Sequence, residues 1–314
     1  MQYTEIAGRK VSAMSLGTVQ LGMNYGIANQ EGKPDLEKSL SILRAAMDAG
    51  VSALDTARNY GDSEEVLGAF FRANPGANEI FFITTKLSTG LPEGSPEADV
   101  EKAVMQSVEL SLRNLGLSKV DCILLHNAAD MKAHGQIMAQ TMRRIVDEGL
   151  CGMAGVSVYH PEEAELLLQY DIYRAIQLPM NVFDLRFQKS GVMERLQQSD
   201  IHIFVRSVFF QGLIFLDPEN ISGNLKFMAP YLRQLRQLSE KAGMTIAQFA
   251  VTFLSGLPGM ASLVLGADNP GQVKENSALF EAPPLKDEIR HEAELAFSDI
   301  DYAAVMAELS RPRQ

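Results

Sequence analysis

The sequence has little positive charge, little cysteine and no long hydrophobic run, and each shortage excludes a class of protein. Its 28 Lys and Arg residues against 39 Asp and Glu give a formal net charge of −11, whereas proteins that bind nucleic acid usually carry a basic surface. The same charge disfavours adsorption to an anionic membrane surface. We therefore expect neither a nucleic acid nor a membrane as a partner.

The two cysteines, Cys122 and Cys151, lie in hydrophobic or glycine-rich segments and lack metal-ligand spacing, so we expect buried, reduced thiols. The histidines also lack such spacing, and we expect no metal. No run approaches the roughly 18 apolar residues of a membrane span, and the first residues have no apolar core of the signal-peptide type. These features predict a cytoplasmic protein.

What the sequence has in quantity is short apolar runs that alternate with amphipathic segments of helical period. Such runs are typical of strands buried on both faces of a parallel sheet. Their near-eightfold repetition within roughly 250 residues predicts an α/β fold, a closed (β/α)8 TIM barrel, formed as a single domain over 1–314. An open doubly wound sheet is disfavoured because no G-x-G-x-x-G follows the first run. The predicted strands are 13–18, 51–56, 79–86, 119–127, 151–158, 173–181, 201–210 and 261–267.

Some segments lie outside this repeat. Residues 2–13 predict an N-terminal β-hairpin that turns at Ala7–Gly8 and closes the bottom of the barrel. Residues 285–310 predict a C-terminal helical extension. The polar segments 24–35 and 127–136 are interpreted as loops beside the substrate pocket, and their composition is compatible with a hydroxylated, sugar-like substrate.

Polar side chains gather at the C-terminal ends of the predicted strands, where barrels of this type build their active sites. The second strand ends at Asp55 and leads to Tyr60, the third ends at Lys86 and the fourth at His126. Each residue alone has a simpler explanation, such as a helix N-cap for Asp55. Their arrangement at three successive strand ends favours a shared function.

The four residue types have complementary chemistry. An ammonium group stabilises a phenolate and lowers the pKa of the phenol, and a buried ammonium in turn needs a carboxylate. A histidine across the site can hold a carbonyl oxygen beside the phenol. The set therefore predicts a general acid that protonates an alkoxide as it forms, which reduction of a carbonyl by hydride requires.

These motifs resemble those of the aldo-keto reductases. DTARNYGDSEEVLG at 55–68, ITTK at 83–86 and DCILLHN at 121–127 are similar to the segments that carry the catalytic residues of that family. Further similar segments follow in the order of the family, and the resemblance covers essentially the whole chain. They are LGTVQLG at 16–22, GVS at 155–157, AIQLPMN at 175–181 and LGADNPGQVKEN at 265–276.

The resemblance implies an NAD(P)(H)-dependent enzyme that reduces an aldehyde or ketone, or oxidises a polyol. Tyr60 would be the proton donor, Lys86 and Asp55 its tuning pair, and His126 the residue that orients the substrate. The cofactor would lie extended across the mouth of the barrel. Its implied contacts are Gly17, Thr18, Asp55, Ser157, Gln177, Arg206, Ser207, Val208, Gln211, Gly212, Leu213, Gly266, Asp268, Gln272 and Asn276.

The sequence departs from the family pattern at three positions. Arg206 stands where many relatives stack an aromatic residue on the nicotinamide; a guanidinium can stack on a planar ring or bind an acidic substrate group bidentately. Val158 replaces a frequent Asn, which removes one carboxamide hydrogen bond. Asp268 favours NAD(H) because it repels a 2′-phosphate, while the family habit and Lys274 favour NADP(H), which we place slightly ahead.

Two other functions are compatible with the same residues. One is a nicotinamide-binding sensor or regulatory subunit with little turnover, as in the channel-associated subunits that the family resembles. The other is a Schiff-base aldolase with Lys86 as nucleophile. The complete set of four polar residues disfavours the sensor, and the sequence leaves the oligomeric state open.

Overall fold

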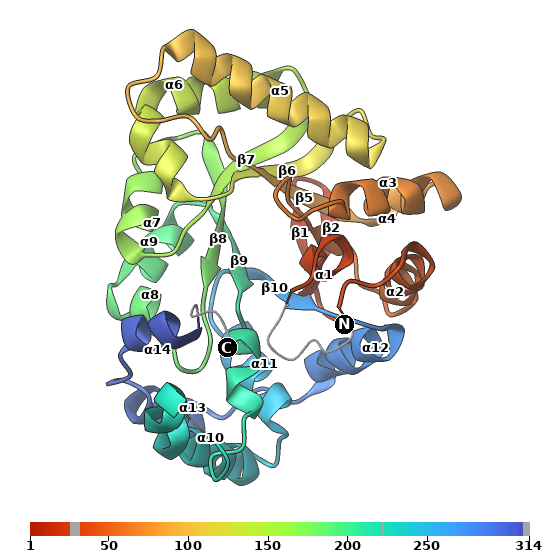
Figure 1. Cartoon of the computed structure of the whole chain (residues 1–314). Helices are drawn as coiled ribbons and strands as arrows, with labels where there is room; N and C mark the ends of the chain where they lie inside the picture. Colours follow the sequence, from red (N-terminus) through yellow and green to blue (C-terminus); the bar gives the residue numbers. More distant parts are fainter. Residues whose placement is uncertain (26–31, 222, 310–314) are drawn as a thin grey trace.

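The computed structural model describes residues 1–25, 32–221 and 223–309, and a closed barrel of parallel strands forms its centre (Figure 1). The strands follow one another around the barrel in the order β10-β3-β4-β5-β6-β7-β8-β9. This confirms the predicted (β/α)8 barrel against the open sheet. The barrel strands are β3 (Met14–Gly17), β4 (Ala53–Asp55), β5 (Phe82–Leu87), β6 (Val120–Leu125), β7 (Cys151–Ser157), β8 (Tyr173–Pro179), β9 (His202–Arg206) and β10 (Met260–Gly266).

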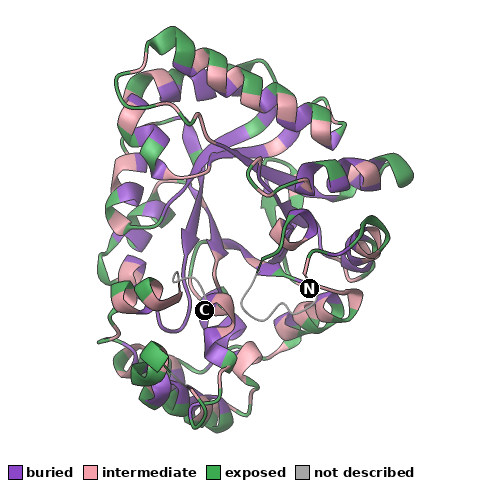
Figure 2. Cartoon of the chain, in the orientation of Figure 1, coloured by how far each residue is buried: buried purple, intermediate pink, exposed green. Residues whose placement is uncertain are grey.

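Helices surround the barrel, with buried residues toward the strands and exposed residues toward solvent (Figure 2). The longer helices of this ring are α2 (Leu36–Asp48), α3 (Ser63–Ala73), α5 (Glu97–Leu115), α6 (Ala128–Asp147), α7 (Pro161–Leu167), α9 (Val192–Gln198), α10 (Ala229–Ala242), α11 (Ile246–Ser255) and α12 (Pro270–Ala278). Short helical turns complete it: α1 (Val19–Gly22), α4 (Ala77–Ile80), α8 (Arg186–Lys189), η1 (Phe210–Phe215), η2 (Gly223–Met228) and η3 (Leu279–Glu281).

Local sequence sets the bounds of these helices, as α2 illustrates. Asp35 Oδ1 accepts a hydrogen bond from the backbone N of Lys38 at 2.8 Å, which satisfies one of the unpaired N–H groups of the first turn. Ile42 and Leu43 are buried against the barrel. Just beyond the helix, Gly50 has φ 77, a left-handed conformation that favours glycine and lets the chain turn back into β4.

The predicted N-terminal hairpin is present and closes one end of the barrel. Strands β1 (Tyr3–Ile6) and β2 (Arg9–Ser12) pair antiparallel around the turn at Ala7–Gly8. The side chains of Ile6 and Val11 are fully buried and belong to one hydrophobic cluster with Phe82 and Phe204. We call this cluster the barrel plug; its members are Ile6, Val11, Ala53, Phe82, Cys122, Leu124, Met153, Ala175, Phe204 and Ala261.

The hairpin is also held from outside by the guanidinium of Arg9. This group donates to the backbone oxygen of Phe81 at 2.6 Å, and its Nε lies 3.5 Å from Asp121 Oδ1. Asp121 Oδ2 in turn accepts from the backbone N of Ile83 at 2.8 Å. The hairpin, the start of β5 and the start of β6 are therefore tied together.

Three predictions about elements need correction. Glu79 and Ile80, expected to begin a strand, belong to the short helix α4. The strand expected over 201–210 ends at Arg206, because Ser207 turns into the left-handed region at φ 63. The polar segment 127–136 is the start of α6, capped by Asn127 and kinked at Gly135. Of the other expected loop, 24–35, residues 26–31 lie outside the described residues.

The tail forms the helical extension that the sequence predicts. It contains α13 (Asp287–Ala296) and α14 (Tyr302–Leu309). The Tyr302 ring stacks on Phe210, with 5.6 Å between the ring centroids, and Phe297 contacts Phe183 edge to face at 4.9 Å. The extension thus packs on the segments that follow β8 and β9.

Both cysteines are free and buried, as the sequence predicts, and burial raises the pKa of Cys151 to about 12. Within the described ranges, none of the helices has the length and apolarity needed to cross a membrane. No group of three or more His, Cys, Asp or Glu side chains in this part of the chain is arranged to hold a metal ion.

Candidate active site

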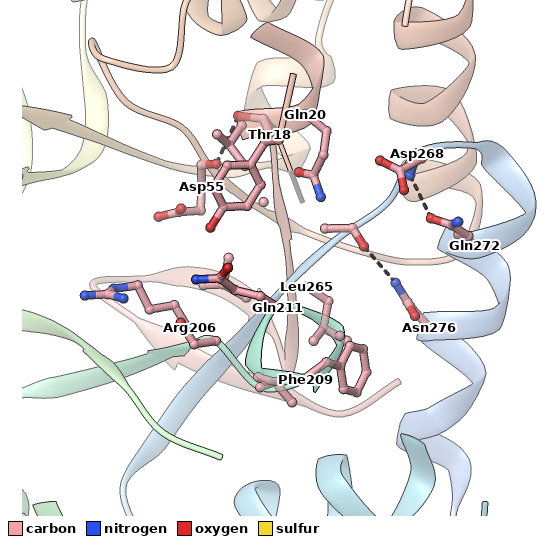
Figure 3. A pocket seen from close by; sticks show the side chains of 18 of the residues that line it. Thr18, Gln20, Asp55, Arg206, Phe209, Gln211, Leu265, Asp268, Gln272 and Asn276 are labelled. Carbon is pink, nitrogen blue, oxygen red and sulfur yellow. Dashed lines mark hydrogen bonds between the residues drawn. The ribbon is translucent and has the colours of Figure 1, made fainter. Parts of the chain in front are cut away.

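Parallel pairing brings the polar strand ends to one edge of the barrel, opposite the plug. Gly17 pairs with Asp55, and Ser157 pairs with Gln177. These residues line one cleft of about 660 Å³ (Figure 3). The sequence-predicted residues that line it are Gly17, Thr18, Asp55, Tyr60, His126, Ser157, Gln177, Arg206, Ser207, Val208, Gln211, Gly212, Gly266, Asp268, Gln272 and Asn276.

Lys86 lies behind the cleft wall, held by three oxygen atoms. Its Nζ donates to Asp55 Oδ2 at 2.7 Å, to the backbone oxygen of Thr56 at 2.9 Å and to the Tyr60 hydroxyl at 3.3 Å. The residue is only 1% exposed. Burial alone would lower the pKa of Lys86, but the Asp55 carboxylate and the Tyr60 hydroxyl outweigh it and hold that pKa above its ordinary value. The ammonium is therefore charged at neutral pH.

Tyr60 sits on the turn between β4 and α3, and two glycines explain how that turn packs. A Cβ on Gly22 would lie 1.7 Å from the backbone oxygen of Tyr60, and one on Gly61 would lie 2.1 Å from the backbone oxygen of Gly22. Gly61 also has φ 57, in the left-handed region. Only glycine at both positions lets the two backbones touch. This contact fixes the turn that carries the phenol.

A buried carboxylate that the sequence analysis missed holds the same turn from the other side. Glu64 Oε1 accepts from Thr85 Oγ1 at 2.7 Å. Its Oε2 accepts from Arg58 at 3.1 Å and from Asn114 Nδ2 at 3.3 Å. The signal was a glutamate on the inward face of a helix, where an unpaired charge is rare.

His126 follows β6 and faces Tyr60. Its backbone N donates to the backbone oxygen of Leu87 at 2.7 Å, and its ring meets the Tyr60 ring edge to face, with 5.5 Å between centroids. Burial, and next the ammonium of Lys86, lower the pKa of His126 from 6.5 to about 4. The imidazole is thus neutral at physiological pH, and its buried Nδ1 has no hydrogen-bond partner among the described residues.

Gln177 connects this cluster to the next part of the cleft. Its Nε2 donates to Asp55 Oδ1 at 2.7 Å, so both carboxylate oxygens of Asp55 are engaged. The amide oxygen of Gln177 is buried and finds no partner within the described part of the chain. Since a buried acceptor without a donor is costly, this atom is suited to a donor from a bound molecule.

The far end of the cleft lies at the end of β10 and the start of α12. Asp268 donates its backbone N to Gln272 Oε1 at 2.8 Å, and Asn276 Nδ2 donates to the backbone oxygen of Gly266 at 3.0 Å (Figure 3, dashed lines). Glu275, not predicted from the sequence, also lines this end. Lys274 is exposed and is not a lining residue.

The segment after β9 crosses the cleft in an unusual backbone conformation. Ser207, Phe210 and Gln211 all have φ between 48 and 63, a region that non-glycine residues rarely adopt and that often marks functional loops. Gln211 lines the cleft, whereas Leu213 is buried beneath the loop and is not a lining residue.

Arg206 lines the cleft at the end occupied by Asp55, away from Asp268 and Asn276 (Figure 3). Its guanidinium donates to the backbone oxygen of Val158 at 3.1 Å and lies 4.2 Å from the centroid of the Tyr159 ring. Sequence reasoning did not find Tyr159. Further lining residues that it missed are Val19, Gln20, Tyr25, Phe209, Phe215, Ala247, Val264, Leu265, Glu275 and Leu279.

The chain is similar to known proteins along most of its length. The model of the Aldo/keto reductase family matches residues 13–294. L-glyceraldehyde 3-phosphate reductase of Escherichia coli K12 is 28% identical and aligns over 88% of this chain and 86% of that protein. Aldo-keto reductase YhdN of Bacillus subtilis is 26% identical, over 89% of this chain and 88% of its own length.

Two further matches extend the comparison. A putative voltage-gated potassium channel subunit beta of Schizosaccharomyces pombe is 26% identical over 86% of this chain and 85% of that protein. The solved structure of an aldo-keto reductase from Bacillus halodurans in its holo form has a TM-score of 0.76, with 97% of this chain and 99% of that chain covered at 19% identity. At that identity the match shows the fold alone.

Proposed function

Because the chain belongs to the aldo/keto reductase family, we propose that it reduces an aldehyde or ketone to the alcohol with a nicotinamide cofactor. One observation carries the proposal: a charged ammonium, a carboxylate and a phenol meet at Lys86, Asp55 and Tyr60 within hydrogen-bond distance. The phenol faces a cleft large enough for a cofactor and a small substrate.

Tyr60 is the proton donor in this proposal. As the carbonyl carbon is reduced, its oxygen becomes an alkoxide, and the Tyr60 hydroxyl gives its proton to that oxygen. The ammonium of Lys86, 3.3 Å from the hydroxyl, stabilises the phenolate that remains. Asp55 keeps Lys86 charged, and it does so at 5% exposure, where water competes little for the ion pair.

His126 orients the substrate. A neutral imidazole carries one N–H donor, which holds the carbonyl oxygen beside the Tyr60 hydroxyl. Because the pKa of His126 is about 4, the imidazole is neutral near pH 7. It therefore holds no extra proton to give to the alkoxide. Burial of the ring, which keeps His126 neutral, therefore makes His126 the hydrogen-bond donor and leaves Tyr60 as the acid.

The cleft suits a nicotinamide cofactor. When bound, a reduced nicotinamide supplies the hydride. Gln177 Oε1, buried and without a partner among the described residues, would accept from the carboxamide, beside Ser157. Val158 is fully buried and has no polar side chain to offer. The backbone N–H groups at the start of α12, capped by Asn269, favour a phosphate nearby.

We propose NAD(H) as the preferred cofactor, although the sequence alone puts NADP(H) slightly ahead. Asp268 and Glu275 both line the far end of the cleft, whereas Lys274, which is next to Glu275 in the sequence, is not a lining residue. Two carboxylates repel a 2′-phosphate and accept from a ribose 2′-hydroxyl.

A small hydroxylated carbonyl compound is the proposed substrate. The relative from Escherichia coli is, by its name, a reductase of L-glyceraldehyde 3-phosphate, which is a small aldehyde. Tyr25 and Tyr159, which the proposal does not assign to the cofactor, also line the cleft, and their hydroxyl groups can bind a polar substrate.

A regulatory subunit is the second candidate, and the relatives described as potassium channel beta subunits favour it. The Schiff-base aldolase is not favoured. A Schiff base needs a neutral, accessible amine, whereas Lys86 is 1% exposed and its pKa is held above its ordinary value by Asp55 and Tyr60 against the opposing effect of burial.

The proposal is tested with the full chain and both reduced cofactors. The fluorescence of bound NADH or NADPH should fall when glycolaldehyde, glyceraldehyde or a simple aldehyde is added, with stoichiometric alcohol as product. Binding of the cofactor without its oxidation by any of these compounds would favour the regulatory subunit. Borohydride trapping should leave Lys86 unmodified.

A further inference from the structure

We propose that Arg206 binds an anionic group of the substrate, a carboxylate or a phosphate, so that the natural substrate is a small carbonyl compound carrying a negative charge. The inference rests on the proposed function of the same cleft. It assigns to Arg206 a role in choosing the substrate rather than in holding the cofactor.

Charge is distributed unevenly along the cleft. The protein has a net charge of −11, and of the described residues that line the cleft Arg206 is the one Lys or Arg. Asp268 lies at the opposite end, away from Arg206 (Figure 3), and the other acidic residue there, Glu275, belongs to α12. Asp55 lines the same end as Arg206, but its carboxylate is paired with Lys86 at 2.7 Å. An anion that enters the cleft is therefore attracted to the end where Tyr60 and His126 stand.

The guanidinium of Arg206 has hydrogen-bonding capacity that the described residues do not use. Arg206 has five N–H donors, and one of its bonds goes to the backbone oxygen of Val158 at 3.1 Å. No carboxylate in the described ranges forms an ion pair with it, whereas Arg58 and Arg186, which are also half-buried, each pair with a carboxylate. A half-buried arginine in a cleft thus keeps a free edge for a planar anion.

Neighbouring residues hold the guanidinium of Arg206 in place. The ring of Tyr159 covers one face of the guanidinium at 4.2 Å. Tyr159 is held in turn by Glu163, whose Oε2 accepts from the backbone N of Tyr159 at 2.7 Å and of His160 at 3.2 Å. Glu163 is itself paired with Lys132 at 2.7 Å, so its charge is not available to neutralise Arg206. Such support keeps a binding group in place before the ligand arrives.

The charge of the guanidinium also favours binding of an anionic substrate by Arg206 over stacking on the nicotinamide. The oxidised nicotinamide ring is positively charged, so a guanidinium against its face would destabilise it by like-charge repulsion. An anionic substrate on the same guanidinium has the opposite sign of interaction. With the carbonyl at Tyr60 and His126, the anionic group of the substrate lies at Arg206, which lines the same cleft.

The test compares matched aldehydes that differ in charge. The pairs are succinic semialdehyde with butanal, and glycolaldehyde phosphate with glycolaldehyde, and they separate a carboxylate from a phosphate. The wild type should prefer the charged member of at least one pair in kcat/KM. In Arg206→Met that preference should fall about 10- to 100-fold, the range for loss of charged hydrogen bonds. Arg44→Met, which removes an equal charge from the exposed face of α2, should keep it.

Equal rates for both members of each pair in the wild type would overturn the inference, and so would a preference that survives in Arg206→Met. If Arg206→Met loses both members of a pair equally, the residue serves the cofactor. If the protein turns over none of these aldehydes, the proposed function fails, but the role of Arg206 can still be tested by measuring ligand binding. Calorimetry with the cofactor-bound protein should find succinamate tighter than the neutral succinamide, and Arg206→Met should remove that difference; equal binding in the wild type refutes the inference.

Discussion

The two ends of the barrel are made by the same strands and have opposite characters. At the plug end, the inward positions are apolar, whereas at the cleft end they are polar. On β9, Phe204 belongs to the plug and Arg206, two residues later, lines the cleft. On β8, Ala175 and Gln177 stand in the same relation. Residues i and i+2 of a strand face the same side. Two residues along each of these strands, the inward-facing side chain therefore changes from part of the hydrophobic core to part of the active site.

The two ends of the barrel therefore serve different purposes: the plug end stabilises the fold, and the cleft end carries the proposed reaction. Residues of the plug should affect folding and leave the reaction intact, whereas the cleft residues should affect the reaction first. The exception is the Lys86–Asp55 pair, which is buried and charged at once. A buried ion pair of this kind changes the free energy of unfolding little while both partners are present. Removal of one partner lowers it strongly, because the other charge is left buried and unpaired.

The largest effect is expected from Tyr60→Phe at the cleft end. Loss of the general acid should lower kcat by about 10²- to 10⁴-fold, while the dissociation constant of the cofactor stays close to the wild-type value. Steady-state rates and cofactor fluorescence measure the two quantities. Tyr3→Phe, on the exposed hairpin, is the matched control, and normal turnover in Tyr60→Phe would remove Tyr60 from its role.

Asp55→Asn tests the Lys86–Asp55 ion pair, which is both buried and charged. The substitution leaves the ammonium of Lys86 buried without its carboxylate, and it should lower the free energy of unfolding by about 3–5 kcal/mol as well as the rate. Chemical denaturation measures the first. The control is Asp171→Asn, which breaks the exposed pair with Arg143 and should cost about 1 kcal/mol or less. Equal effects in the two variants would contradict the importance of burial.

Ile6→Ala breaks the plug end. Its side chain is fully buried, so the substitution should cost about 2–5 kcal/mol of unfolding free energy. The folded fraction should retain the wild-type kcat, because Ile6 belongs to the plug and does not line the cleft. A large loss of kcat at full folding would show that the two ends are coupled.

The pH dependence of stability sharpens the comparison. Because burial, and next Lys86, depress the pKa of His126 from 6.5 to about 4, the unfolded chain takes up a proton between these values that the folded protein does not. Unfolding is therefore favoured as the pH falls from 6.5 toward 4, with a loss of at most about 3 kcal/mol and less where solvent reaches the ring. His126→Asn should flatten this part of the stability curve. His291→Asn, on the exposed tail, should leave it unchanged, and an equal slope in both variants would contradict the assignment.

The smallest effect concerns the far end of the cleft. Asp268→Ser removes one of the two carboxylates there and should shift the ratio of kcat/KM for NADPH over NADH upward by about five- to tenfold, as expected for a charge pair partly screened by water. Direct dissociation constants check the same shift. Glu281→Gln, an exposed change of equal charge, is the control. An unchanged ratio in Asp268→Ser would mean that Asp268 does not face the ribose.

The sequence predicted the barrel, the hairpin and its turn because alternation, turn residues and strand ends are local signals. It did not predict that Tyr159 meets Arg206 or that Glu275 rather than Lys274 lines the cleft, since both depend on how separate elements are oriented. The interpretation of 127–136 as a loop was wrong because polar residues and Gly135 obscured a helix. Met131 and Met138 are buried in that helix, and their spacing was the overlooked sign.

The enclosure of Lys86 has a consequence for its reactivity toward reagents. An amine that is sealed from solvent and holds its proton against three oxygen atoms cannot act as a nucleophile toward acylating compounds. Mild amine labelling of the folded protein should therefore mark the surface lysines and spare this one, so that the amine on which the proposed reaction depends is also the one best protected from covalent damage.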